Sequence, residues 1–337
     1  MTSRTDNAPT GRLHDRDLKR FRLTVQAAFT LFCVFCGYRF YQFYLWASGK
    51  SELFVPRPPA IEAFLPISGL VGLKQLLLSG VYDDIHPAGL TIFIAALLTS
   101  LLFRKGFCGW ICPVGFTSNL AEKLGLKLKI LRRAPAWLDI PLLSLKYLLL
   151  GLFAFLILVQ MDLEAIRAFN HTPYNVVVDA KMLLLFMQPS PLTLWVMGFL
   201  VVVSFVSRNF WCRYLCPYGA LLGILALASP MRVQRDQERC IDCHKCEKAC
   251  PGSIRVASKT SINVPECVGC LECVAACPVA DCLSVAAVGK RRLPALLLPI
   301  AVLALFFALW GWAKTSGHWQ QQVSLDILRL YYHNLGM

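Results

Sequence analysis

The stretch Cys240-Ile-Asp-Cys243-His-Lys-Cys246-Glu-Lys-Ala-Cys250-Pro251 has a pattern that returns in Cys267-Val-Gly-Cys270-Leu-Glu-Cys273-Val-Ala-Ala-Cys277-Pro278. Iron–sulfur proteins hold [4Fe-4S] clusters with cysteines at this spacing. Three thiolates of one run then bind one cluster, and the fourth thiolate binds the other. The two runs therefore predict two clusters and a chain that carries electrons.

Crossed ligation divides the eight cysteines into two predicted ligand sets. The first cluster is assigned to Cys240, Cys243, Cys246 and Cys277, and the second to Cys267, Cys270, Cys273 and Cys250. Gly269 suits a close approach of the backbone to inorganic sulfide, because glycine has no side chain. A pair of zinc knuckles or a disulfide scaffold is the alternative, but zinc sites rarely need four cysteines at this spacing twice over.

The rest of the chain is apolar enough to lie in a membrane. Of its 337 residues 56% are hydrophobic, and a spanning helix needs about 20 largely apolar residues. Five stretches qualify: 22–46, 85–103, 141–161, 183–207 and 293–313. A short cleavable leader is not expected, so the first helix should remain as an anchor.

Lys and Arg are distributed unevenly between the segments that join these stretches. Residues 1–22, 104–139 and 208–292 carry 25 of them, and the alternate segments 47–84, 162–182 and 314–337 carry seven. Because cytoplasmic loops are enriched in these residues, the N-terminus and both clusters are predicted to lie in the cytoplasm. The protein would then be a multi-pass protein of the bacterial inner membrane, in contact with lipid. The net charge of +14 is explained by this topology, and no nucleic-acid partner is expected.

The predicted fold is mainly α, a polytopic transmembrane helical bundle of about five spans with an internal repeat and a cytoplasmic ferredoxin-like α+β domain. We expect a disordered N-terminus over 1–20, the bundle over 21–230 and the two-cluster domain over 231–290. Residues 291–337 should form the fifth helix and a short periplasmic tail, with an amphipathic helix over 322–335. Residues 61–80 are interpreted as interfacial or re-entrant, because proline, glycine and lysine interrupt them.

The repeat pairs Arg104-Lys-Gly-Phe-Cys108-Gly-Trp-Ile-Cys112-Pro113 with Arg208-Asn-Phe-Trp-Cys212-Arg-Tyr-Leu-Cys216-Pro217. Residues i and i+4 of a helical turn share one face, so each turn offers two thiols in one direction. Repeated membrane hairpins place their sites between the repeats, so the four thiols could converge. A third redox or metal site for iron, an iron–sulfur cluster or zinc, a reversible disulfide, and plain packing all remain open.

Other titratable residues are weaker candidates. A quinol site needs a proton acceptor, and His86, with Asp83 and Asp84, offers one on the outer side; His171 and Asp179 are alternatives. A lone histidine at a helix end is more often structural. His244 is expected to tune the first cluster, and Cys282 to shield one.

The duplicated Cys-x3-Cys-Pro turns followed by the double cysteine run resemble the membrane polyferredoxin family of NapH and of the C-terminal half of NosR, with the NapH-like pattern nearest. They are also similar to the related FixG/CcoG-type proteins. The resemblance implies an inner-membrane protein of respiratory electron transfer, in which the eight cysteines from Cys240 to Cys277 match cluster ligands. It also implies the quinone pool and a periplasmic or membrane redox protein as partners.

The leading hypothesis is a membrane electron carrier between the quinone pool and a respiratory reductase or its partner, a component of a quinol dehydrogenase if quinol is oxidised on this chain. The main rival is a maturation factor that supplies electrons to reduce a metal such as copper. A scaffold with structural clusters is a third reading. No nucleophilic triad or phosphate loop is visible. The direction of electron flow is not encoded in the spacing, because cluster potentials vary widely at identical ligation.

Overall fold

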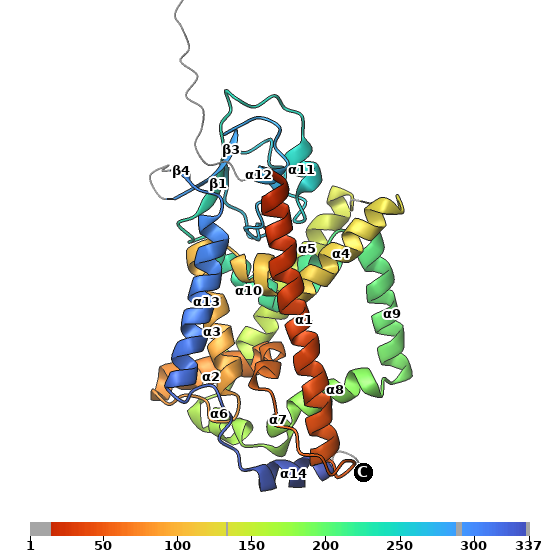
Figure 1. Cartoon of the computed structure of the whole chain (residues 1–337), viewed down its shortest axis with the longest axis vertical. Coiled ribbons are helices and arrows are strands. Elements are labelled where there is room, and N and C mark those ends of the chain that lie inside the picture. Colours follow the sequence, from red (N-terminus) through yellow and green to blue (C-terminus); the bar gives the residue numbers. More distant parts are fainter. Residues whose placement is uncertain (1–14, 133, 288–291, 335–337) are drawn as a thin grey trace, which may run out of the picture.

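The computed structural model describes residues 15–132, 134–287 and 292–334, which form a helical bundle with a small sheet domain at one end (Figure 1). The bundle helices are α1 (Asp15–Ala47), α2 (Pro66–Ser79), α3 (Pro87–Phe103), α4 (Pro113–Lys127), α5 (Ala136–Ala154), α6 (Leu163–Asn170), α7 (Pro173–Val176), α8 (Val178–Met187), α9 (Pro191–Val206), α10 (Pro217–Ala226), α13 (Leu297–Thr315) and α14 (Leu325–Asn334). Four short helical turns accompany them: η1 (Pro59–Phe64), η2 (Phe107–Ile111), η3 (Phe155–Gln160) and η4 (Trp211–Leu215).

Within the described residues, three helices are long and apolar enough to cross a membrane: Asp17–Ala47, Trp137–Gln160 and Leu297–Thr315. They agree with three of the five predicted spans. A fourth is possible if the bent pair α8 and α9 is one span. The predicted span 85–103 is α3, whose 17 residues make it a shorter apolar helix.

The prediction of one continuous helix over 183–207 was wrong. α8 ends at Met187, α9 begins at Pro191, and the two helices meet at an angle of 79°. Pro189 and Pro191 lack the N–H that a continuing helix would need, and a proline ring clashes with the preceding turn. Ser190 instead caps α9 by accepting a hydrogen bond from the Thr193 N–H.

The first 20 residues were predicted to be disordered, but α1 begins at Asp15. Residues 1–14 lie outside the described part of the chain. The start of α1 is ordered because it packs on the sheet domain: Leu18 is buried in the core that the two parts share. α1 therefore runs from the sheet domain to the opposite end, where α14 lies (Figure 1). The predicted amphipathic helix over 322–335 corresponds to α14.

α3 is the central element of the bundle. It packs against α2, α10 and α13, and most of its residues are buried. The end of η1 and all of α2 make up most of the stretch 61–80. Lys74 of α2 donates hydrogen bonds to the carbonyl of Ile157, at 3.0 Å, and to that of Met161. Those carbonyls lie at the C-terminal end of η3, where the helix stops and supplies no further N–H donors for them.

The small domain contains a four-stranded antiparallel sheet in the order β2-β1-β3-β4 in the described residues. Its strands are β1 (Arg232–Arg235), β2 (Ser261–Ile262), β3 (Leu283–Ala286) and β4 (Arg292–Leu293). The central pairing sets Val233 opposite Val285. One short helix lies inside each cysteine run, α11 (Lys245–Ala249) and α12 (Glu272–Ala275). The sheet and the two short helices agree with the expected α+β domain.

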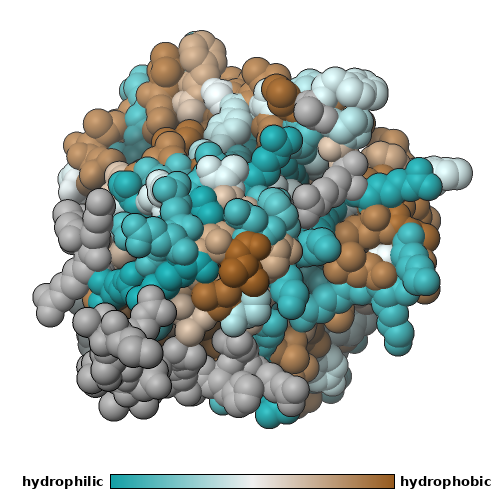
Figure 2. All heavy atoms as spheres, turned by 90° about the horizontal axis from the view of Figure 1, so that it is seen from above, coloured by the Kyte–Doolittle hydropathy of each residue, from teal (hydrophilic) through white to brown (hydrophobic). Residues whose placement is uncertain are grey.

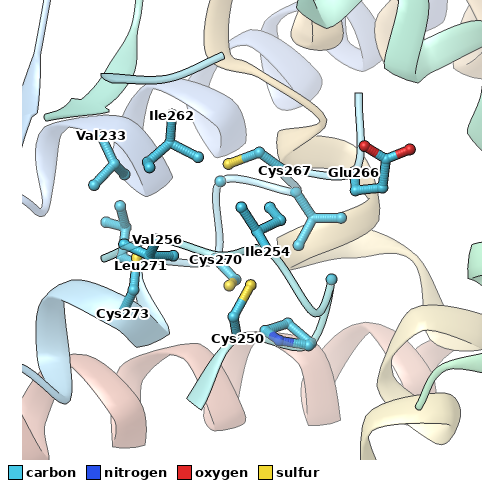
Figure 3. A pocket seen from close by; sticks show the side chains of 14 residues that line it. Val233, Cys250, Ile254, Val256, Ile262, Glu266, Cys267, Cys270, Leu271 and Cys273 are labelled. Atoms are coloured by element: carbon cyan, nitrogen blue, oxygen red, sulfur yellow. The ribbon is translucent and has the colours of Figure 1, made fainter. Parts of the chain in front are cut away.

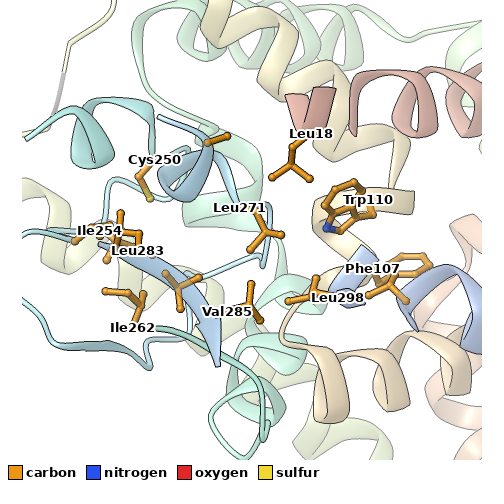
Figure 4. Packing of buried hydrophobic residues seen from close by; sticks show 14 of the residues in the cluster. Leu18, Phe107, Trp110, Cys250, Ile254, Ile262, Leu271, Leu283, Val285 and Leu298 are labelled. Atoms are coloured by element: carbon orange, nitrogen blue, oxygen red, sulfur yellow. The ribbon is translucent and has the colours of Figure 1, made fainter. Parts of the chain in front are cut away.

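One hydrophobic core continues from the sheet domain into the bundle (Figure 4). Leu271, in the second cysteine run, is 1% exposed, and Trp110, in η2, is fully buried. Leu18 of α1 and Leu298 of α13 belong to the same core. The sheet domain is therefore built onto the bundle.

Backbone contacts reinforce this junction. Gly109 lies so close to the second cysteine run that an added Cβ would stand 2.3 Å from the Val268 carbonyl oxygen. The Trp110 Nε1–H donates to the Gly269 carbonyl oxygen at 3.0 Å. On the other side of the domain, Arg208 donates to the carbonyl oxygens of Lys248 and Cys250, both at 3.1 Å. Each duplicated turn thus holds a different cysteine run.

The end of the molecule formed by the sheet domain is polar. Figure 2 looks onto this end and shows hydrophilic residues over most of its centre, with hydrophobic residues toward the rim. The exposed apolar side chains on the long helices, such as Leu31 on α1 (69%) and Trp195 on α9 (81%), are those expected of surfaces that face lipid.

Gly109→Ala tests the close approach. The new methyl group would meet a backbone carbonyl that cannot rotate away, and overpacking of this kind costs about 1–3 kcal/mol. We expect a lower midpoint of thermal unfolding and faster proteolysis between bundle and sheet domain. Gly151→Ala, where a Cβ would meet nothing within 4 Å, is the matched control. Equal behaviour of the two variants would show that the contact does not hold the domain.

Candidate metal centres

Four cysteines line a hollow in the sheet domain, here called hollow A. They are Cys250 from the first run and Cys267, Cys270 and Cys273 from the second, around about 360 Å³ of space that atoms do not fill. Apolar side chains, among them Ile254 and Leu271, complete the lining (Figure 3). In Figure 3 the thiols of Cys250 and Cys270 point toward each other.

A second hollow, hollow B, lies beneath the first cysteine run. It contains Cys240, Cys243 and Cys246 of that run and Cys277 of the second, around about 340 Å³. The structure therefore brings together the two sets of four cysteines that crossed ligation predicts, three from one run and one from the other.

The two loops also share a backbone conformation. Asp242 and His244 in the first run have φ of 47° and 54°, and Gly269 and Leu271 at the matching positions of the second have φ of 60°. Non-glycine residues rarely adopt positive φ, and such backbone strain gathers at functional sites. The same strained turn, made twice, indicates that both loops are shaped around the same kind of group.

The environments of the two hollows differ. Cys250 in hollow A is buried, and burial raises the pKa of Cys250 to about 11 and that of Cys270 to about 12. Cys243 in hollow B is exposed, and the neighbouring Ile241 is 65% exposed. A metal that binds at hollow A must therefore displace thiol protons that burial holds firmly.

The donor set fits a cluster better than a single ion. Across the described ranges, no three His, Cys, Asp or Glu side chains stand close enough together to hold one metal ion. A cubane binds its four thiolates at four separate corners, so it does not need them to meet at one point. Soft thiolates around an apolar space are the ligands that iron–sulfur clusters use.

The two turns that carry the four bundle cysteines are in contact, since the Cys212 thiol lies 3.7 Å from Ser118 Oγ of α4, the helix that Cys112 caps. Burial raises the pKa of Cys108 to about 11; Lys105 opposes the rise, and Cys216 of the other turn adds to it. Burial likewise raises the pKa of Cys212 to about 12, to which Cys216 and Cys108 add. The pKa of Cys112 is also raised, by burial first and then by Cys108 and Cys212. All are free thiols, so no disulfide joins the turns.

The turns differ from the predicted α-helical geometry. η2 and η4 are both π-helical, with the N–H of Cys112 bonded to the Phe107 carbonyl and that of Cys216 to the Trp211 carbonyl, each at 2.9 Å. π-Helical turns occur often at functional sites. A proline follows each turn as the first residue of the next helix, a position where it needs no N–H donor.

His86, the candidate quinol base, lies far from these thiols. It caps the start of α3, whereas Cys108 follows the other end of that helix, and the 17 residues of α3 span about 26 Å. His86 is fully buried, its Nε2–H donates to the Asn175 carbonyl at 2.8 Å, and its Nδ1 lies 3.7 Å from Glu62 Oε1.

The other candidate residues for a quinol site differ in burial: Asp179 and Asp83 are buried, His171 is exposed and Asp84 is partly exposed. Asp179 is buried and forms an ion pair with Arg57 at 2.6 Å, and Arg57 also pairs with Glu62 at 2.7 Å. His171 is exposed and lies 4.0 Å from Asp84. Asp83 accepts hydrogen bonds from the backbone N–H groups of Ile85 and His86.

Sequence reasoning missed Glu62 and Arg57. Arg57 lies between prolines, and Glu62 interrupts an apolar stretch; charged residues in such places need buried partners, which was the available signal.

The two residues expected near a cluster both line hollow B. His244 is exposed and lies 3.5 Å from Glu247. Cys282 is 2% exposed, and its thiol lies 3.6 Å from the Asp236 carbonyl oxygen. Its burial beside the four cysteines is compatible with the expected shielding role.

Comparison with known proteins gives matches over most of the chain. A 4Fe-4S binding domain model matches twice, at residues 85–131 and 189–234, and a 4Fe-4S dicluster domain model matches residues 232–278. The two copies of the first model each contain one Cys-x3-Cys-Pro turn. No solved structure matches the chain significantly.

Among curated proteins, YccM of Escherichia coli (strain K12) is 41% identical over 291 residues, which cover 84% of this chain and 81% of YccM. NapH of Haemophilus influenzae is 27% identical over 172 residues, 49% of this chain and 55% of NapH. NosR of Pseudomonas aeruginosa is 30% identical over 168 residues, 47% of this chain and 21% of NosR. Together with the cysteine-lined hollows, these matches place the chain in the membrane polyferredoxin family of iron–sulfur electron-transfer proteins.

Proposed function

We propose that this chain passes electrons between the membrane quinone pool and a respiratory reductase or its partner, through two [4Fe-4S] groups. The observation that carries the proposal is the mixed composition of hollows A and B, each with three cysteines from one run and one from the other. The ligands would be Cys250, Cys267, Cys270 and Cys273 in hollow A, and Cys240, Cys243, Cys246 and Cys277 in hollow B. A bound [4Fe-4S] group would accept or return one electron without covalent chemistry on a substrate.

The residues around the hollows would hold each group in a fixed environment. The eight thiols would bind as thiolates, so loading releases protons. Ile254 and Leu271 exclude water from hollow A, and exposed Cys243 leaves hollow B open to a water-soluble partner. The names of the relatives agree with such a role: YccM is described as a candidate electron transport protein, and NapH as a ferredoxin-type protein.

The topology we propose has five membrane crossings and both cluster groups in the cytoplasm. α3 and the pair α8 and α9 would supply the second and fourth crossings. The segments rich in Lys and Arg, around α1's start, α4 and the sheet domain, lie at one end of the molecule in Figure 1, and α14 lies at the other. This two-ended arrangement supports the assignment, because loops that alternate along the sequence gather at opposite ends. The two Cys-x3-Cys-Pro halves would be an internal repeat.

We also propose that Cys108, Cys112, Cys212 and Cys216 hold a third redox or metal group between the two π-helical turns. The Cys212 thiol lies 3.7 Å from Ser118 Oγ of α4, the helix that Cys112 caps, and this contact between the two turns supports it.

A role in maturation is the second candidate. The thiols of the two turns are soft ligands suited to a copper ion. NosR is described as a regulatory protein, which fits a function other than simple electron transfer. Copper binding and reduction of cupric ion by the purified protein would favour this candidate. Neither property is expected of a simple carrier.

Metal analysis tests the two proposed ligand sets. The protein purified without oxygen should contain about eight iron and eight sulfide per chain from the two cubanes, plus any metal of the third site. Cys243→Ser should remove the electron paramagnetic resonance (EPR) signal of the hollow B group and leave the hollow A signal. Cys282→Ser, which changes a thiol outside both ligand sets, should keep both. Loss of neither signal in Cys243→Ser would refute the assignment.

A quinol analogue tests the electron partner. Added to the anaerobic protein in detergent, it should reduce at least one centre, seen by EPR, because a quinol gives up electrons and the quinone pool is the proposed electron partner. If two clusters are present and quinol leaves every centre oxidised, electrons must come from another protein, and the maturation role moves to first place.

The third site predicts a separate effect. Cys112→Ser and Cys212→Ser should lower the metal content while the signals of hollows A and B persist, and should slow quinol-driven reduction at least tenfold. Cys33→Ser, a change to a partly buried thiol within α1, is the control. Unchanged metal content and rate would show that the four thiols only pack.

A further inference from the structure

Arg22 of α1 lies against the second cysteine run, which lines hollow A. Its side chain is 7% exposed, its Nε–H donates to the Gly109 carbonyl oxygen at 3.1 Å, and its Nη1 forms an ion pair with Glu272 at 2.7 Å. Both partners lie beside the cysteine loop, since an added Cβ on Gly109 would stand 3.7 Å from the Cys270 N–H nitrogen, and Glu272 lies between Cys270 and Cys273.

One donor of this guanidinium is left over. In the part of the chain that the structure describes, the buried Nη2 of Arg22 has no hydrogen-bond partner. A buried cationic N–H without a partner is costly, so such atoms need an explanation. The same guanidinium holds Glu272, which stands two residues after Cys270 and one before Cys273, both of which line hollow A. The spare donor is thus next to the predicted ligands.

We propose that Arg22 donates its spare N–H, together with its positive charge, to the sulfur-bearing group of hollow A and thereby raises the reduction potential of that group. The proposal rests on the proposed function, in that hollow A must hold a [4Fe-4S] group. Reduction adds one electron to the group and makes no bond. The reduced form carries one more negative charge, which a nearby cation and a hydrogen bond to sulfur both stabilise.

The charges around hollow A favour this assignment. Glu272 is paired with Arg22 itself, and Glu266, which lines the hollow, lies 3.5 Å from Lys146 of α5. Arg208 donates to the Cys250 carbonyl on the opposite side and lies 3.3 Å from Glu122. Each carboxylate near the hollow therefore has a cationic partner, and Arg22 contributes a donor beyond its own ion pair.

Hollow B offers an internal comparison. Arg235 lines it, but Arg235 lies 3.7 Å from the exposed Asp242, and Cys243 is open to solvent. Water screens charge–charge interactions at such a site far more than in an enclosed one. The effect of Arg22 should thus be confined to hollow A and larger than that of Arg235 on hollow B.

The test is an EPR-monitored redox titration of the full-length protein in detergent, with the two signals assigned by Cys243→Ser. Arg22→Gln should lower the midpoint potential of the hollow A group by about 59 mV, a tenfold change in its one-electron equilibrium. The hollow B group should not move. Arg22→Lys, which keeps the charge but not the forked donors, should shift it by less. Arg20→Gln removes the same charge from an exposed position of α1 and should leave both midpoints unchanged.

The outcomes separate the two proposals. An unchanged hollow A midpoint in folded Arg22→Gln would show that Arg22 only clamps α1 to α12. If Arg22→Gln fails to fold or to hold the group, the result rests on Arg22→Lys, where an unaltered midpoint would mean the same. If the wild-type protein gives no hollow A signal at all, the proposed function fails and the role of Arg22 with it. Arg235→Gln should shift only the hollow B midpoint, and a shift at hollow A would contradict a local effect.

Discussion

Guanidinium groups that bind backbone carbonyls hold the cysteine loops against the bundle, and the rest of the structure depends on these contacts. The loops contain little regular structure, since α11 has five residues and α12 four, so many of their carbonyls have no partner in a helix or sheet. A buried carbonyl without a donor costs about 1–3 kcal/mol, and a charged donor makes the stronger bond. Arg208 satisfies the carbonyls around Cys250, and Arg104 donates to the Val264 carbonyl at 2.7 Å, shortly before Cys267.

The duplicated turns solve this problem in two different ways. Arg104 and Arg208 stand at matching positions, and each holds the chain that enters one side of hollow A. Five residues later the copies diverge: Gly109 lets two backbones touch, whereas Arg213 at the matching position extends its side chain to the Gly252 carbonyl. Both copies therefore face hollow A, and hollow B is left at the surface. Because both turns hold the backbone around hollow A, the two hollows differ in exposure: Cys250 in hollow A is buried, whereas Cys243 in hollow B is exposed.

The cysteine spacing was sufficient to predict which residues share a hollow, because a cubane geometry restricts the ligand pattern strongly. The three long helices were predictable for a similar reason, since length and hydropathy suffice. The break at Gln188–Ser190 was missed because an average over a window of residues does not register two prolines. The order at Asp15–Arg20 was missed because charged residues look disordered until a partner is known, and the partner surface around Leu271 is remote in sequence.

The interpretation of His86 as a candidate quinol base is also limited by a partner that is remote in sequence. The sequence correctly places a histidine at the end of a helix, but it does not show that the Glu62 carboxylate lies beside the His86 ring. Glu62 faces His86, accepts a hydrogen bond from the Gly89 N–H at 2.9 Å and pairs with Arg57, which also holds Asp179. Tyr332 of α14 donates to Asp179 at 2.8 Å, so this network fastens the last helix to the start of α3. A quinol gives up protons and electrons together, and about 26 Å of α3 separates this network from the nearest cysteine turn. The buried charged residues at this end are therefore better explained as a network that anchors the bundle than as a site where quinol is oxidised to supply hollow A with electrons.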